Sequence, residues 1–223
     1  ALVEKAVKKD LSRIVPATAT VRTPRTRQAA PALPPSSPSL PVNLAWGYEG
    51  MGGPENWSRI RPENAVCASG RLQSPIDLRD GIAVDLEPMQ FDYRPAAFRV
   101  VDAGRNLQVA VYGGGFSLLG KAYELVRVHF HRPAEFTVAG RAFAMDVQLV
   151  HKSDDGRLAI VSVLLEPGTE NAFVQTALNN LPLDKGGELS PPGRTIDLSS
   201  VLPEQKAYYT FMGSLTMPPC TED

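Results

Sequence analysis

Apolar and polar residues alternate with a period of two through the middle of the chain. Between Phe91 and Leu165 this alternation recurs in short runs separated by Gly, Asp or Pro, namely NLQVAV, AYELVRVHFH, RAFAMDVQLVH and RLAIVSVLL. A period of two places successive side chains on opposite faces of a strand, so these runs predict a mainly antiparallel sheet. Helical spacing of apolar residues is sparse, and ENAFVQTALNNL (170–181) is the best helix candidate. The pattern therefore predicts a mainly β fold of the α+β class.

The first 43 residues follow a different pattern. In residues 2–15 the apolar side chains form one helical stripe, which predicts a short amphipathic helix that alone would be marginally stable in water. Seven prolines follow between Pro16 and Pro41, among few large apolar side chains, and predict an extended linker. We expect an arm over residues 1–43 and a globular domain over residues 44–223.

Charge divides the chain at the same place. The 223 residues carry a net charge of −1; residues 1–43 hold seven Lys or Arg against two acids, a net of +5, so the remainder carries −6. The basic segment lacks interleaved aromatic residues, which argues against nucleic-acid binding. No run of about 18 apolar residues occurs, so no transmembrane segment is expected. The arm is expected either to bind a protein partner or to be a disordered leader.

Two of the three histidines lie two residues apart in a predicted strand. His129 and His131 share one face with Arg127, and two imidazoles on one face can both reach one metal ion. His151 lies three residues after Gln148 on the next run, and odd spacing places it on the opposite face. A catalytic zinc usually takes three protein ligands, so the sequence leaves the third ligand to be found.

The two cysteines are Cys67 and Cys220, without a CxxC spacing. Their count is compatible with one disulfide or with two free buried thiols. A zinc finger built from them and two histidines has the wrong spacing.

Five motifs resemble, in order, those of the α-class carbonic anhydrases, including bacterial members. They span most of residues 45–223 and read AWGYEGMGGPENW, RLQSPIDL, HFHRPAEFTVAG, LVHKSDDGRLAIVSVLLEPG and YYTFMGSLTMPPCTE. The resemblance implies a large twisted, mostly antiparallel sheet with few short helices, a Cys67–Cys220 disulfide, and export to the periplasm or the outside. It also implies that several dozen residues, including one more strand, would follow Asp223, so the domain is expected to be C-terminally incomplete; a strand donated by another chain is the alternative.

The resemblance also implies a zinc site, and this sequence departs from it. The family's first two histidine ligands match His129 and His131, whereas its third matches Gln148, whose amide oxygen is a weaker ligand. Losing one of four ligands costs on the order of 3 kcal/mol, about a hundredfold in affinity. We expect zinc to be bound weakly or not at all.

Neighbouring positions depart from the family too. Arg127 stands where the family has a glutamine that accepts a hydrogen bond from the first ligand. Asp146 stands where the family has a glutamate, two residues before its third ligand. Arg105 stands at the proton-shuttle histidine, and a guanidinium does not release its proton near neutral pH. Other family positions are kept or changed more mildly: the zinc-hydroxide threonine Thr216, its acceptor Glu135, Tyr48 of the cleft network, and the pocket positions Val150, Leu215 and Met217.

Two hypotheses follow. In the first, the chain is an exported carbonic-anhydrase-related protein that is catalytically impaired and serves as a scaffold or binding module. In the second, it is a zinc-dependent carbonate dehydratase (a lyase) that hydrates carbon dioxide to bicarbonate with a site of two histidines and Gln148. The sequence alone leaves open whether the protein is an enzyme.

Overall fold

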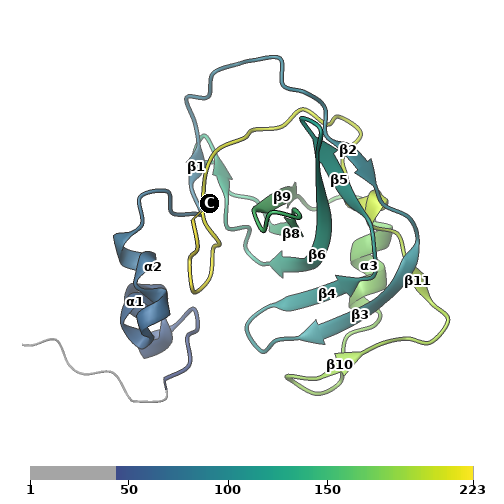
Figure 1. Ribbon diagram of the computed structural model, residues 1–223. Coiled ribbons are helices and arrows are strands. Elements are labelled where there is room, and N and C mark those ends of the chain that lie inside the picture. The colour runs from purple at the N-terminus through teal and green to yellow at the C-terminus, as the bar shows by residue number, and fades with distance from the viewer. Residues whose placement is uncertain (1–43, 223) are drawn as a thin grey trace, which may run out of the picture. The chain divides into compact units, whose positions relative to one another are not determined.

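The computed structural model describes residues 44–222 (Figure 1). The amphipathic helix and the proline-rich linker predicted for residues 1–43 lie outside the described residues. Within them the chain is mostly strand, with few short helices, as the alternation predicted. No helix of this described part is long and apolar enough to cross a membrane.

Nine strands form one antiparallel sheet in the described residues. The order β10-β3-β4-β6-β5-β2 makes up its main path, β11 pairs with β3, and β8 lies between β6 and β9. A separate two-stranded parallel pair joins β1 to β7. The strands are β1 (Asp77–Leu78), β2 (Gln90–Asp92), β3 (Ala96–Asp102), β4 (Leu107–Val111), β5 (Gly115–Leu118), β6 (Lys121–His131), β7 (Thr137–Val138), β8 (Met145–Lys152), β9 (Leu158–Leu165), β10 (Glu188–Leu189) and β11 (Thr195–Ile196).

One helix longer than a single turn occurs in this region, and it covers one face of the sheet. Helix α3 (Ala172–Leu178) begins where the Asn171 side chain accepts a hydrogen bond from Val174 N, and it falls within the predicted 170–181. Its Phe173 ring stacks on Phe130 of β6 at 5.8 Å between centroids. The core therefore lies on this face, formed by alternate apolar residues of the strands with α3 and the 3-10 helix η4 (Leu198–Val201).

The opposite face of the central strands carries polar side chains. In β6 and β8 the core takes Val128, Phe130, Val147 and Leu149, so the residues between them point to the other face. β8 is buried on both faces, since its six consecutive residues from Asp146 to His151 are all buried. Polar groups on this second face are thus shielded from solvent.

Short helices precede the sheet and were not predicted from the sequence. They are α1 (Trp57–Ile60), α2 (Val66–Ser69) and the 3-10 helices η1 (Gly50–Gly52), η2 (Pro54–Asn56) and η3 (Pro62–Asn64). The buried Trp57 fixes this segment, because its indole N–H donates to Gly47 O and Gly52 O at 2.8 and 3.0 Å. Single turns of this length leave no periodic pattern that a sequence window could detect.

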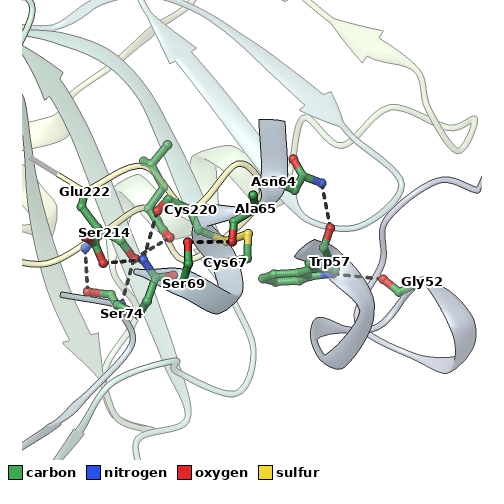
Figure 2. The surroundings of a disulfide bond; sticks show 12 residues. Gly52, Trp57, Asn64, Ala65, Cys67, Ser69, Ser74, Ser214, Cys220 and Glu222 are labelled. Carbon is green, nitrogen blue, oxygen red and sulfur yellow. Dashed lines mark hydrogen bonds between the residues drawn. A yellow bond between two sulfur atoms is a disulfide. The ribbon is translucent and has the colours of Figure 1, made fainter. Parts of the chain in front are cut away.

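A disulfide joins α2 to the end of the described chain (Figure 2). Cys67 and Cys220 are 153 residues apart in sequence. Hydrogen bonds reinforce the connection: the Glu222 carboxylate accepts from Leu72 N at 2.6 Å, and Ser74 and Ser214 each donate a backbone N–H to the other's hydroxyl at 2.9 and 3.1 Å. The segment between Ser214 and Glu222, which carries Thr216, is therefore held at both ends.

Candidate functional site

Strand register brings the predicted site residues onto one face. Across β6 and β8, His129 pairs with Gln148 and His131 with Asp146, and residues paired in this way share a face. Arg127 pairs with Val150, after a bulge that interrupts the register between Leu125 and Arg127. The row through His129 extends to Gln108 of β4. Gln148 thus lies beside the two imidazoles, as the family resemblance implied.

The Arg127 side chain bonds directly to His129. Its Nε donates to His129 Nε2 at 2.7 Å, and the Asn106 amide lies 3.1 Å from the other ring nitrogen, Nδ1. Burial, followed by the charges of Arg127 and His131, lowers the pKa of His129 to about 3. The imidazole is therefore neutral at physiological pH, and its Nε2 lone pair is used by the guanidinium.

A closed network of acids and an amide lies next to it. Asp146, which is fully buried, accepts from His131 Nδ1 at 2.8 Å through one oxygen and from Glu135 N at 3.1 Å through the other. The Gln148 amide donates to Glu135 at 2.8 Å and to Asp146 at 3.2 Å. Gln148 therefore turns its N–H₂ end to the two carboxylates, whereas the sequence had pointed to its oxygen as a metal ligand.

Three of these groups could in principle hold a metal ion. Ligand atoms of His131, Glu135 and Asp146 lie within 4.8 Å of one another. The Gln148 amide already bonds to both carboxylates, so an ion would have to displace it. His131 Nε2 is buried without a hydrogen-bond partner in the described residues. It is the one imidazole nitrogen of the pair that stays open for coordination.

The zinc ion that the resemblance implies does not fit this arrangement. One of the two imidazoles uses its Nε2 for Arg127, and the third position offers an amide that is already engaged by carboxylates. A guanidinium bonded to the ligand nitrogen also places a positive charge where a dication would bind. Zinc binding would require Arg127 and Gln148 both to move.

His151 lies on the opposite face, as its spacing indicated. Its Nε2 lies 2.6 Å from the Tyr93 hydroxyl, its ring packs edge-on against Phe116, and it is fully buried. Burial lowers the pKa of His151 to about 4. It therefore does not supply the missing third ligand.

Tyr48 and Arg105 both lie near Trp46. The Tyr48 and Trp46 rings meet edge-on at 5.9 Å, and the Arg105 guanidinium lies 4.4 Å from the Trp46 ring centre and donates through Nε to Trp46 O. Burial, followed by the charges of Glu135 and Asp146, raises the pKa of Tyr48 to about 12. The phenol thus stays protonated and remains close enough to the two carboxylates to sense their charge.

Thr216 is buried in the segment that the disulfide holds, flanked by the half-buried Leu215 and Met217. No hydrogen bond joins Thr216 to Glu135 among residues 44–222, and Glu135 bonds to Gln148 instead. Val150 is almost completely buried beside Arg127. Sequence reasoning missed Asn106, although it directly follows Arg105 on the approach to β4 and its amide contacts His129.

Comparisons with known proteins agree with the fold and the motifs. The family described as eukaryotic-type carbonic anhydrase matches residues 52–223. A carbonic anhydrase of Nostoc sp. is 34% identical over 194 residues, covering 84% of this chain and 74% of the relative. The solved α-carbonic anhydrase of Thermovibrio ammonificans, in complex with sulfanilamide, superimposes with a TM-score of 0.76 at 35% identity and 80% coverage of each chain. Dioscorin, solved in complex with ascorbate, superimposes with a TM-score of 0.72 at 32% identity, covering 80% of this chain and 79% of that chain.

Proposed function

This chain belongs to the carbonic anhydrase family, and we propose that it is a member with impaired zinc chemistry that serves as a scaffold or binding module. The observation that carries the proposal is the 2.7 Å hydrogen bond from Arg127 Nε to His129 Nε2. In this family zinc needs imidazole nitrogens with free lone pairs, and here the first of them is occupied. Gln148 adds to the effect, because its amide is bonded to Glu135 and Asp146.

Proton transfer is impaired by the same set of changes. Arg105 occupies the position of the shuttle histidine, its guanidinium stays protonated near neutral pH, and it stacks on Trp46. The changes at Gln148, Arg127 and Arg105 affect successive steps of one reaction. Restoring the family's residue at one of these positions alone would therefore not restore turnover. The fold that surrounds the site is kept, which supports a binding role for it.

The test compares zinc content and carbon dioxide hydration in the wild type and in the double variant Arg127→Gln/Gln148→His. We expect the wild type, purified from zinc-supplemented medium, to carry substoichiometric zinc and to hydrate carbon dioxide no faster than buffer. The double variant frees the His129 nitrogen and supplies a third imidazole, so it should gain zinc. Gln90→His, which adds a histidine at an exposed position of β2, is the matched control and should gain none.

The alternative function is an active zinc-dependent carbonic anhydrase acting on carbon dioxide and bicarbonate. The unpartnered, buried His131 Nε2 favours it, because one ligand nitrogen is available. Stoichiometric zinc in the wild type, with hydration activity that a sulfonamide inhibits, would establish this alternative and refute the impaired-enzyme proposal.

Export and tethering extend the proposal. The Cys67–Cys220 disulfide supports a periplasmic or secreted location, because such bonds persist in oxidising compartments. Residues 1–43, with a net charge of +5, would tether the domain to an acidic protein partner. Fractionation of the native host tests the location. Co-purification of partners with the full chain and with a chain that lacks residues 1–43 tests the tether. An unchanged set of partners after the deletion would refute the proposal that residues 1–43 bind a partner.

A further inference from the structure

The far end of the Arg127 side chain has no partner in the described residues. Its Nε is fixed by His129, but its two terminal nitrogens form no hydrogen bond and no ion pair with any residue of 44–222. Burial does not explain this, since the solvent-inaccessible unpartnered atoms of this region are Arg99 Nε, His131 Nε2 and Ser162 Oγ. Arg127 as a residue is half-buried, and its terminal nitrogens are not among these solvent-inaccessible atoms, so they reach solvent while Nε is held by His129.

The neighbours of Arg127 across the sheet are apolar. It pairs with Val150 of β8, which pairs with Ile160 of β9. The acids on this face, Asp146 and Glu135, bond to His131 and Gln148 instead. Within residues 44–222 no carboxylate lies at ion-pair distance from Arg127, so its charge is compensated only by what approaches from solvent.

We propose that the terminal edge of Arg127 binds the carboxylate group of a small organic acid, at the place where the family holds its metal. A guanidinium edge matches a carboxylate with two parallel N–H···O hydrogen bonds, and such charge-assisted pairs are strong when water is partly excluded. The hydrogen bond to His129 removes most of the side-chain freedom that binding would otherwise have to restrict. The inference rests on the proposed function, because zinc on His129 would require Arg127 to leave.

The experiment uses acetate as the probe. The full chain, labelled with ¹⁵N, is freed of metal with 1,10-phenanthroline and titrated with sodium acetate in a buffer without carboxylates, at constant ionic strength. We expect a saturable shift of the Arg127 Nε–H signal and of backbone amides in β6 and β8. Arg127→Gln should weaken binding by about tenfold or more, and Arg127→Lys should also weaken it, since lysine keeps the charge but loses the fork.

Arg61→Gln is the matched control, because it removes an exposed arginine that lies 3.8 Å from Glu63, and it should leave acetate binding unchanged. The proposal is overturned if the wild type shows no saturable shift, if chloride and sulfate produce the same shifts, or if Arg127→Gln binds acetate as the wild type does. Zinc measured in the same preparation before chelation keeps the two proposals apart. Stoichiometric zinc refutes the proposed function, whereas a zinc-free protein that shows no saturable binding of acetate refutes only the carboxylate site.

Discussion

Removing the Cys67–Cys220 disulfide should cost more stability than removing one of the hydrogen bonds that join the same two segments. The bond closes a loop of 153 residues. In the chain-entropy model a loop of that length restricts the unfolded chain by about 17 cal/mol/K, or about 5 kcal/mol at 25 °C. The perturbation is the double replacement Cys67→Ser/Cys220→Ser, which leaves no unpaired thiol behind. Domains of this size are stable by about 5–15 kcal/mol, so the variant should be close to its unfolding threshold.

Equilibrium unfolding in urea, followed by tryptophan fluorescence and by circular dichroism, measures the loss. With a slope near 2 kcal/mol/M, the midpoint should fall by about 2–3 M. Ser214→Ala serves as the control. It removes the hydroxyl that accepts a hydrogen bond from Ser74 N near the disulfide, and it should lower the free energy of unfolding by about 1 kcal/mol. A loss in the double variant no larger than that of Ser214→Ala would refute the argument that the covalent link, rather than the surrounding hydrogen bonds, holds the segment.

Two further predictions concern the fold around the site. The pKa of His151 falls from 6.5 in the unfolded chain to about 4 in the folded one, so only the unfolded state takes up its proton between these values. Stability should therefore drop by about 3 kcal/mol as the pH falls from 6.5 to 4, and the pH profile of His151→Gln should lack that contribution; parallel profiles would contradict it. Gly115→Ala should destabilise the fold by about 1–3 kcal/mol, because its Cβ would meet Tyr123 O at 2.2 Å, whereas Gly47→Ala, with open space around it, should be near neutral in the same urea assay.

The fold could be predicted from the sequence where a period of two persisted. The four predicted runs between Phe91 and Leu165 correspond to β4, β6, β8 and β9. The period of two placed His129 and His131 on one face, whereas the expectation that Gln148 joins them came from the family resemblance. The order of strands could not be predicted in this way, because pairing depends on contacts between distant segments. The single-turn helices α1 and α2 left no periodic signal, and the cysteine pairing came from the family resemblance rather than from spacing.

The sequence predicted which residues form the site, but it did not predict the hydrogen bonds between them. The family resemblance showed that Gln148 stands in place of a histidine and Arg127 in place of a glutamine. These two differences predicted a loss of zinc affinity. The contact between Arg127 and His129 was not visible, because it depends on the bulge before Arg127 and on one side-chain rotamer. The orientation of the Gln148 amide likewise depends on Glu135, which lies between β6 and β7 and reaches the site only in the folded chain.

The central claim is that Arg127 occupies the nitrogen of His129 that a metal would need. The most direct test is a crystal structure of the full chain grown with zinc chloride, with anomalous data collected at the zinc absorption edge. We predict no anomalous peak between His129 and His131, and Arg127 Nε within hydrogen-bond distance of His129 Nε2. A fully occupied peak about 2.1 Å from both imidazoles, with Arg127 turned away, would contradict the account.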